Sequence, residues 1–428
     1  MYKLIQIITL LAISANLFAQ PVLLKKASPV SANISEVQLT NIDKMLQQYV
    51  DSGWANGAIG FIARDGKVVY NKAFGWDDID LKTPIKADGI FRIASQTKAI
   101  TSVAVMMLFE KGKFLLDDPI SKYIPEFANP QVLASYNNKD TTYTTVPACR
   151  EITIRDLLTH TSGIDYASIG SPNMVAIYKK AGIPASDFNN NRLILGNEIR
   201  KLGKLPLIHN PGEKFTYGLN VDVLGYLVEV VSGMDLNTFF SKNIFEPLQM
   251  NDTYFNLPAS KHSRLIKLYT ENESHQLVLW KNDKDISYSQ VDSNYPNCNK
   301  TYFSGGGGLS STIEDYAIFL QMLLNNGEYN GHRILSKSSV ELMTMNQIGD
   351  LVIDKNNKFG LGFQIATPES QARLGLTPGT FSWGGFFGSI YWVDPKEKLV
   401  CQLCLQLIPL KHVEIQDKFR AMVYQSLK

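Results

Sequence analysis

The spacing of apolar residues in the first quarter of the chain predicts a helix, a β-hairpin and a second, buried helix. Between residues 36 and 50, apolar side chains recur every three or four positions, as in an amphipathic helix. Residues 57–70 contain two apolar runs on either side of Asp65-Gly66, a dipeptide that favours a tight hairpin turn. Residues 91–108 begin as a short apolar approach and continue as a helix that is apolar nearly all round, which is expected of a helix in a protein interior.

Helical spacing continues through the middle of the chain, and strand-like runs return near its end. Further helices are expected within residues 152–163, 221–231, 313–324 and 414–426. Runs at 381–393 and 399–407 predict strands, whereas residues 121–150 look turn-rich. We therefore predict an α/β (α+β) fold. Its strands and helices come from about residues 36–120 and 300–428, and a helical subdomain is inserted at about 121–300.

The bulk composition is that of a globular protein with a large core. The chain has 428 residues, of which 45% are hydrophobic and 19% charged, so it has ample apolar side chains to bury. Its formal net charge is +2, and no cluster of Lys and Arg is interleaved with aromatic residues. Nucleic acid is therefore not expected as a partner.

The N-terminus has the organisation of a signal peptide. Lys3 supplies a positive charge, residues 4–18 form an apolar run, and Ala19 is a small residue before the expected cleavage point. The run is short for a transmembrane helix. We expect residues 1–19 to be removed and residues 20–35 to form a linker. The mature protein would then be exported, periplasmic or secreted, without stable membrane insertion. An uncleaved membrane anchor is the alternative.

The four cysteines and six histidines show no pattern of a metal site. Cys401 and Cys404 lie three residues apart on a predicted strand and face opposite sides, so they are not expected to bond to each other. Cys149 and Cys298 lie in polar, loop-like stretches, and a disulfide between them is left open. No repeated Cys-x-x-Cys, His-x-His or His-Glu-x-x-His occurs, so no metal and no other cofactor is expected.

The strongest candidate for chemistry is Ser95, at the junction between the apolar approach and the buried helix. Lys98 follows three residues later, so on a helix the two side chains share one face. A serine hydroxyl is a weak nucleophile until a base removes its proton, and a lysine can do so only in its neutral form, which burial favours. Ser-x-x-Lys is an acyl-transfer motif and occurs once in this chain. The alternative is that Ser95 only caps the helix.

Two further stretches contain groups that a serine–lysine acyl enzyme needs. Tyr217 precedes a strong helix on a predicted loop, from which its phenol could relay a proton. Trp383-Gly384-Gly385 opens a predicted strand, and glycines within a strand often mark the close approach of a ligand or another backbone. The alternatives are a packing tyrosine and a β-bulge. Neither a phosphate-binding loop nor a Gly-x-Ser-x-Gly elbow is present, so a nucleotide site and an α/β-hydrolase are disfavoured.

Taken in order, these motifs resemble those of the serine β-lactamase and penicillin-binding-protein superfamily. The likeness is to its class C-like branch, and within that to the β-lactamase-related (family VIII) carboxylesterases. The motifs are Ser95-Gln96-Thr97-Lys98, Leu157–Gly163, Tyr217 ahead of Asp222-Val223-Leu224-Gly225, Gly306–Thr312, and Trp383-Gly384-Gly385 followed by Trp392–Pro395. The resemblance covers about residues 36–428. It implies a β-lactamase/transpeptidase-like fold, with an antiparallel sheet flanked by helices and an inserted helical subdomain.

The resemblance also implies roles for individual residues. Ser95 would be the nucleophile, Lys98 its base and Tyr217 the relay that serves both acylation and deacylation. The backbone N–H groups of Ser95 and Phe386 would form the oxyanion hole.

Two departures from the β-lactamase pattern bear on the substrate. The pattern Tyr-x-Asn is broken, because Asn220, the candidate substrate-binding amide, stands one place late. Lys-Thr-Gly, whose lysine and threonine normally hold a substrate carboxylate, is replaced by Trp383, Gly384 and Gly385. These residues would line the substrate with an apolar wall and no cation.

We therefore expect an exported serine hydrolase that forms an acyl-enzyme on Ser95 and acts on small carboxylic esters. One alternative is a D-alanyl-peptide carboxypeptidase or class C-like β-lactamase, which acts on an amide. The others are an acyltransferase that passes the acyl group to an alcohol, and a penicillin-binding sensor that does not turn over. In each case the partner is a small-molecule ester or amide.

Overall fold

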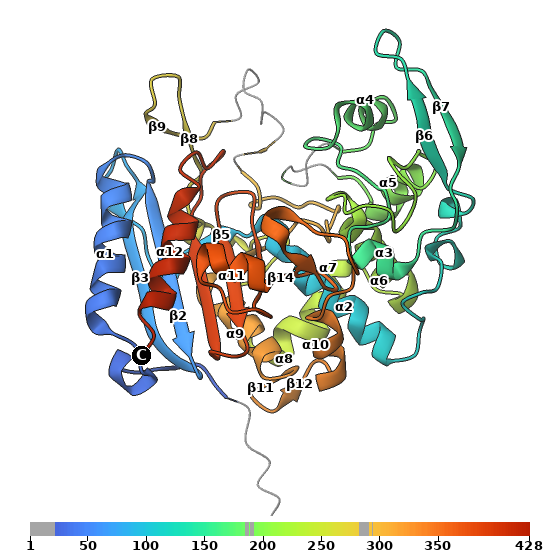
Figure 1. Ribbon diagram of the computed structural model, residues 1–428. Coiled ribbons are helices and arrows are strands. Elements are labelled where there is room, and N and C mark those ends of the chain that lie inside the picture. The colour runs from blue at the N-terminus through green and yellow to red at the C-terminus, as the bar shows by residue number, and fades with distance from the viewer. Residues whose placement is uncertain (1–21, 185–187, 189–191, 282–290, 293) are drawn as a thin grey trace, which may run out of the picture.

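Figure 1 shows the computed structural model, which describes residues 22–184, 188, 192–281, 291–292 and 294–428. The predicted signal peptide lies outside the described residues. A central sheet carries helices on both faces, and a largely helical part lies beside it. This arrangement confirms the predicted fold class.

The central sheet is built from both ends of the chain. Its strand order is β1-β3-β2-β17-β16-β15-β14-β13, with β4 paired on β3. The strands are β1 (Lys25–Lys26), β2 (Gly57–Arg64), β3 (Lys67–Asp78), β4 (Thr83–Pro84), β13 (Lys358–Phe359), β14 (Gln364–Ile365), β15 (Phe381–Gly384), β16 (Ile390–Asp394) and β17 (Leu399–Cys404). Neighbouring strands are antiparallel, except that β1 and β3 are parallel.

The N-terminal hairpin forms as predicted. Asp65 and Gly66 connect β2 to β3 with φ angles of 52° and 72°. Left-handed backbone at both central positions is what a two-residue type I′ turn requires. Strand β17 pairs with the other edge of β2, so the C-terminal strands are joined to the N-terminal hairpin.

The sheet separates two hydrophobic cores. One core contains α1 (Glu36–Asp51) and α12 (Glu414–Gln425), which pack against each other on one face of the sheet. The other contains α2 (Thr97–Glu110) and α9 (Ile313–Leu324) and continues into the helical part. The candidate nucleophile belongs to this second, larger side.

The helical part lies between α2 and β10 in the sequence. Its helices are α3 (Ile154–Leu158), α4 (Pro172–Lys180), α5 (Leu195–Leu202), α6 (Asn220–Ser232), α7 (Leu236–Phe240) and α8 (Glu246–Leu248). Its strands are β6 (Gln131–Tyr136) with β7 (Tyr143–Pro147), and β8 (Tyr269–Glu271) with β9 (Leu277–Leu279). Strands β5 (Ile90–Arg92) and β10 (Ser310–Thr312) pair where this part leaves and rejoins the sheet region. The remaining strands and α-helices in the described residues are β11 (Glu328–Tyr329), β12 (His332–Arg333), α10 (Lys337–Met343) and α11 (Pro368–Leu374).

Three of the predicted helices begin or end at the capping residues that the sequence contains. Thr153 and Asp156 form a capping box at the start of α3. The Thr312 side chain accepts from the Asp315 N–H and begins α9. Gly233, with φ of 71°, ends α6.

Two predictions about strands are wrong. Residues 121–150 contain the β6–β7 hairpin, and every residue of β7 is exposed, so no buried face leaves a two-residue period in the sequence. The predicted strand 381–393 is two strands, because the chain reverses between β15 and β16. In this turn the Gly385 N–H donates to the Ser389 carbonyl at 2.7 Å, and Gly388 has a φ of 93°.

The four cysteines are free thiols. Cys401 and Cys404 lie on β17 with their side chains in different cores, which confirms that they do not bond to each other. Cys149 is exposed and Cys298 half-buried, and the disulfide left open between them is not formed.

In the part of the chain that the structure describes, no single helix is long and apolar enough to cross a membrane. Among the described helices, one pair, α6 with Leu236–Leu248, meets the length and composition requirement together, and this pair is bent by 79°.

Candidate active site

Ser95 lies in a 3-10 turn, Ala94–Gln96, that leads directly into α2. The turn follows β5, and the Ile93 N–H donates to the Leu309 carbonyl at 3.2 Å. Ala94 has a φ of 47°, an uncommon conformation for a residue with a side chain, and it directly precedes the candidate nucleophile. The N-cap position of α2 is Gln96, so Ser95 does not serve as the helix cap.

Lys98, in the first turn of α2, contacts Ser95. Its Nζ lies 3.2 Å from Ser95 Oγ, and the residue is 2% exposed. The same nitrogen donates to the Tyr166 hydroxyl at 2.8 Å and to the Gly306 carbonyl at 2.6 Å. Three acceptors therefore hold Nζ beside the serine. Nζ is within reach of the Ser95 proton, which it can accept once it has lost one of its own.

Tyr217 completes the contacts to Ser95. Its hydroxyl donates to Ser95 Oγ at 2.7 Å and accepts from the Trp383 indole N–H at 3.3 Å. Lys98 Nζ lies 4.7 Å from the centre of the Tyr217 ring. The structure thus brings together four residues that the sequence placed on three separate stretches.

A turn at residues 159–163 shapes the loop that carries Tyr217. The His160 carbonyl accepts from the Thr216 N–H at 2.7 Å, directly before the tyrosine. The turn needs left-handed backbone at His160, with φ of 57°, and at Gly163, with φ of 87°. A Cβ at Gly163 would lie 2.3 Å from a carbonyl oxygen of the neighbouring loop, so glycine is required there.

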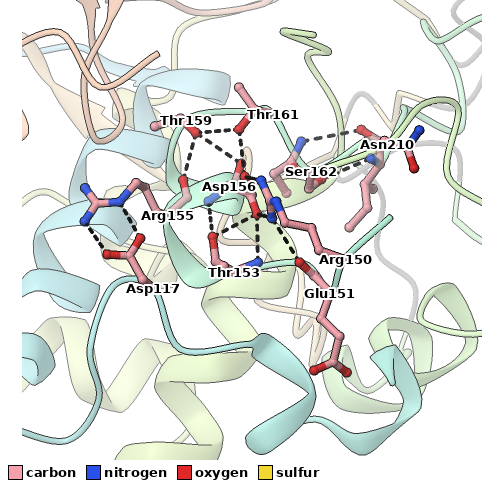
Figure 2. Close-up of polar contacts among 12 residues, drawn as sticks. Asp117, Arg150, Glu151, Thr153, Arg155, Asp156, Thr159, Thr161, Ser162 and Asn210 are labelled. Atoms are coloured by element: carbon pink, nitrogen blue, oxygen red, sulfur yellow. Dashed lines mark hydrogen bonds and ion pairs between the residues drawn. The ribbon is translucent and has the colours of Figure 1, made fainter. Parts of the chain in front are cut away.

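Asp156 anchors this turn to α3 (Figure 2). Its buried carboxylate accepts from the Arg150 guanidinium at 2.6 and 2.9 Å, and from the Thr153 N–H and hydroxyl, both at 2.8 Å. It also accepts from the Thr161 hydroxyl at 3.2 Å. Five hydrogen bonds on one carboxylate make the turn a rigid support for the loop before α6.

The His160 ring packs against Tyr217, with ring centroids 4.9 Å apart. The residue is 1% exposed, and its Nδ1 pairs with the Asn220 side-chain amide at 3.0 Å. Burial and the positive charge of Lys98 lower the pKa of His160 well below its usual range. The ring is therefore a neutral packing group beneath the tyrosine.

Asn220 does not reach the cleft, so the expectation that it contacts substrate is wrong. It is the first residue of α6 and is fully buried. Its side-chain oxygen accepts from the Ser162 hydroxyl, and its NH₂ group donates to His160 Nδ1. Because both ends of the amide are bound inside the protein, Asn220 ties α6 to the 159–163 turn.

An open cleft of about 420 Å³ contains Ser95 and Tyr217 in its wall. Its other lining residues are Ile169, Asp354, Gln364, Leu374, Leu376, Ser382, Trp383, Gly384, Gly385, Phe386, Ser389, Ile390, Val413, Gln416, Asp417 and Arg420. A Cβ at Gly385 would lie 2.6 Å from the Ile93 carbonyl oxygen, so the end of β15 packs directly against the turn that carries Ser95. Ser95 and Phe386 line this one cleft, and the oxyanion hole formed by their N–H groups stays a prediction.

The sequence model of the family described as Beta-lactamase matches residues 42–406. The chain belongs to the beta-lactamase family. The match spans most of the chain and includes the positions of Ser95, Lys98, Tyr217 and Trp383.

Members of the beta-lactamase family with several different names are similar to this chain. Protein Rv1367c of Mycobacterium tuberculosis (strain ATCC 25618 / H37Rv) is 32% identical over 85% of this chain and 89% of its own length. A putative D-alanyl-D-alanine carboxypeptidase of Escherichia coli (strain K12) is 27% identical over 91% and 87% of the two chains. Esterase EstB of Burkholderia gladioli is 26% identical over 82% and 86%.

Among solved structures, EstCE1, a hydrolase with promiscuous acyltransferase activity, superposes with a TM-score of 0.77. It is 24% identical, and the match covers 92% of this chain and all of EstCE1. At this identity the likeness supports the beta-lactamase fold and not a shared substrate.

Tyr166 is a member of the site that the sequence did not predict. Its hydroxyl accepts from Lys98, its ring centroid lies 5.2 Å from that of Tyr217, and it is 8% exposed. The chain has 19 tyrosines, and the one signal for this position is that it follows the Leu157–Gly163 motif by three residues.

Within the described residues, no group of three or more His, Cys, Asp or Glu side chains is arranged to hold a metal ion.

Proposed function

We propose that this protein is an exported serine esterase that forms an acyl-enzyme on Ser95 and hydrolyses small, neutral carboxylic esters. The observation that carries the proposal is the pair of contacts to Ser95 Oγ, from the Tyr217 hydroxyl at 2.7 Å and Lys98 Nζ at 3.2 Å. Acyl transfer needs a group that takes the serine proton and later gives a proton to the leaving group. The family's members named as esterases and carboxypeptidases support hydrolysis of an acyl bond.

In the acylation step, Ser95 Oγ forms a bond to the ester carbonyl carbon while its proton passes to Lys98 Nζ in its neutral form. The carbonyl electrons move to the oxygen, which would accept hydrogen bonds from the N–H groups of Ser95 and Phe386. The intermediate then expels the alcohol, which takes a proton from Tyr217. The product is an ester between Ser95 and the acyl group.

In the deacylation step, a water molecule attacks the acyl carbon and gives one proton to the Tyr217 oxygen. The bond to Ser95 Oγ breaks as Oγ takes its proton back from Lys98, and a carboxylic acid leaves. Trp383 holds a donor on the Tyr217 oxygen throughout, which is the atom that must release and recover a proton.

The charges around the cleft favour a neutral substrate. Trp383 stands where β-lactamases carry a lysine. Among the described lining residues Arg420 is the cation, and it pairs with Asp417 at 3.3 Å, while Asp354 adds another carboxylate. A substrate carboxylate would therefore meet more negative than positive charge.

One observation favours a second candidate substrate, an amide that bears a carboxylate, such as a D-alanyl peptide or a β-lactam. Arg420 Nε is buried and has no hydrogen-bond partner among the described residues. Arg420 also lines the cleft with 14% of its side chain exposed, so a substrate carboxylate could accept from the exposed part of its guanidinium. In that case Arg420→Gln would lower cephalosporin cleavage more than ester cleavage.

The test compares turnover of a short-chain nitrophenyl ester with that of a chromogenic cephalosporin, and detects adducts by intact mass. We expect fast ester turnover, a transient acyl adduct and little cephalosporin cleavage. Ser95→Ala is the control and should form no adduct at an unchanged melting temperature. Faster cephalosporin cleavage would favour the second candidate, and turnover by Ser95→Ala would refute the mechanism.

The sequence of residues 1–19 supports the proposed export. Lys3, the apolar run at 4–18 and Ala19 have the order of a cleavable signal. Expression of the full chain in a Gram-negative host should yield a periplasmic protein whose N-terminus is Gln20. An intact N-terminus in the membrane fraction would indicate an anchor instead.

A further inference from the structure

A buried carboxyl group, Asp222, lies behind Lys98 and has no role in the mechanism above. It is in the first turn of α6 and is fully buried. Its Oδ1 accepts from the Ser304 hydroxyl at 2.6 Å and from the Gly306 N–H at 3.2 Å. Its Oδ2 is also buried, with no hydrogen-bond partner among the described residues. Burial of a carboxyl group costs free energy, so its position beside the site calls for a function.

An uninterrupted series of hydrogen bonds joins Asp222 to Lys98. Lys98 Nζ donates to the Gly306 carbonyl at 2.6 Å. The same peptide group carries the Gly307 N–H, which donates to Ser304 Oγ at 3.0 Å. The Ser304 hydroxyl then donates to Asp222 Oδ1. Every hydrogen in this series points toward Asp222, so the bonds polarise one another and place electron density on the Gly306 carbonyl oxygen.

The glycine-rich segment allows this close approach. A Cβ at Gly306 would lie 2.4 Å from Asp222 Oδ2, and one at Gly305 would lie 2.7 Å from the Val221 carbonyl oxygen. The Thr101 hydroxyl on α2 donates to the Gly305 carbonyl at 2.7 Å, so the segment is bound to both α2 and α6. These contacts account for a glycine run that is not a phosphate-binding loop.

We propose that Asp222 is a positioning residue for acyl transfer: through Ser304 and the Gly306–Gly307 peptide group, it fixes and polarises the carbonyl that holds Lys98 Nζ beside Ser95. This inference rests on the proposed function of Ser95 and Lys98. Asp222 contacts neither substrate nor reacting atoms. It acts through a backbone carbonyl, as the aspartate of a Ser-His-Asp triad acts through a histidine.

The titratable groups that face Lys98 in the described structure come from two loops and one helix. Tyr166 and His160 belong to the loop after α3, Tyr217 to the loop before α6, and Asp222 to α6 itself. Burial raises the pKa of Asp222, whereas the Ser304 hydroxyl, the charge of Lys98 and the Gly306 N–H favour its ionised form. Asp222 is the carboxyl group of this set, so it is the one that can balance a positive charge on Lys98.

A double-mutant cycle on the full-length protein tests the proposal. Ser304→Ala cuts the series, and Asp222→Asn keeps an acceptor oxygen but loses the charge. The first readout is the rate constant for covalent labelling of Ser95 by a fluorophosphonate across pH, and the second is kcat/KM for a nitrophenyl ester. We expect each variant to be about 10- to 100-fold slower. In each variant the acidic limb of both pH profiles should move to lower pH. The reason is that a less polarised Gly306 carbonyl stabilises the ammonium form of Lys98 less.

The double variant should be no slower than the slower single variant, because both changes cut one series. If Asp222→Asn does not fold, Ser304→Cys, which keeps a weak donor and acceptor, should fall between wild type and Ser304→Ala. Thr101→Val is the matched control, since it removes a hydrogen bond to the same segment outside the series. It should lower the melting temperature and leave the acidic limb in place.

An acidic limb that stays fixed in Ser304→Ala and Asp222→Asn would overturn the inference, and so would effects that add in the double variant. If the wild-type protein is labelled at Ser95 but does not hydrolyse the nitrophenyl ester, the proposed ester substrate is refuted. The double-mutant cycle can then still be measured from the labelling rate constants. A wild-type protein that is not labelled at Ser95 would refute the mechanism and the inference together.

Discussion

Trp383 contacts Tyr217 through both its ring and its N–H group. The two ring centroids are 5.3 Å apart, and the indole N–H donates to the phenol oxygen at 3.3 Å. Phe359 packs edge-on against the indole at 5.4 Å and fixes its orientation. Trp383, which stands where the β-lactamase pattern has a lysine, therefore also supplies a hydrogen bond to Tyr217, the proposed proton relay.

Two substitutions at Trp383 separate these contributions. Trp383→Phe keeps an aromatic wall and removes the donor, so kcat for a nitrophenyl ester should fall about tenfold with little change in KM. Trp383→Lys removes the wall and adds a cation, so kcat/KM for neutral esters should fall further. Steady-state kinetics on both variants measure this. Equal kcat values for Trp383→Phe and wild type would show that the N–H has no part in the reaction.

Because His160 is buried as a neutral ring, the folded protein should lose stability in acid. Its pKa is lowered in the folded protein by burial and by Lys98, so below the ordinary histidine pKa of about 6.5 the unfolded chain binds a proton that the folded protein does not. The contribution of the neutral His160 ring to the free energy of unfolding is therefore fully present above that pH. Below it the contribution declines, by about 2 kcal/mol between pH 6.5 and 5. Denaturant unfolding at several pH values measures the decline.

His160→Asn should remove this component of the pH dependence. Asparagine tolerates the left-handed backbone and offers an acceptor near the position of Nδ1. His332→Asn, at an exposed position on β12, is the control and should leave the decline unchanged. The same slope in wild type and His160→Asn would mean that another group is responsible.

The part of the site that the sequence predicted is the part held by short spacing or by recognisable motifs. Ser95 and Lys98 meet because they are three residues apart at a helix start. The bond from Trp383 to Tyr217 joins residues 166 positions apart, and no local pattern specifies it. Asn220 was misplaced because its position beside Tyr217 in the sequence does not show that its side chain turns inward to His160.

At the level of elements, the end of β15 packs closely against the turn that carries Ser95. A Cβ at Gly385 would lie 2.6 Å from the Ile93 carbonyl oxygen, whereas at Gly384 the nearest atom would be 3.1 Å away. Gly385→Ala should push the strand from the turn, destabilise the protein by about 1–3 kcal/mol and lower kcat about 100-fold. Gly384→Ala is the control and should cost much less. Melting curves and ester kinetics on the pair compare the two positions.

Elements with a buried face or a strong cap were predictable. Helix α1 and the β2–β3 hairpin bury one side or more and have clear periodicity or a turn dipeptide. The β6–β7 hairpin was missed because β7 is exposed throughout, so its strand residues carry no alternation of burial. The turn between β15 and β16 was missed because its glycines suit both a weakened strand and a reversal.

For the whole molecule, strand β17 connects the two cores. Its residues alternate between the α1–α12 side and the α2–α9 side, and it pairs with β2 from the other end of the chain. Neither core can lose its contacts without disturbing the strand that serves the other. The structure therefore predicts that the two sides unfold together.

Cys401 and Cys404 report on the two cores separately. Burial raises the pKa of both thiols, to about 12 for Cys404, so neither should react with a disulfide reagent in the folded protein. Two single-thiol proteins are needed, each with Cys149→Ser and Cys298→Ser, and with either Cys404→Ala or Cys401→Ala. Both thiols should become reactive at the same denaturant concentration, since β17 contributes to both cores. If Cys401 reacted at a lower concentration than Cys404, the layer of α1 and α12 would detach before the part that carries Ser95, and the molecule would not be one cooperative unit.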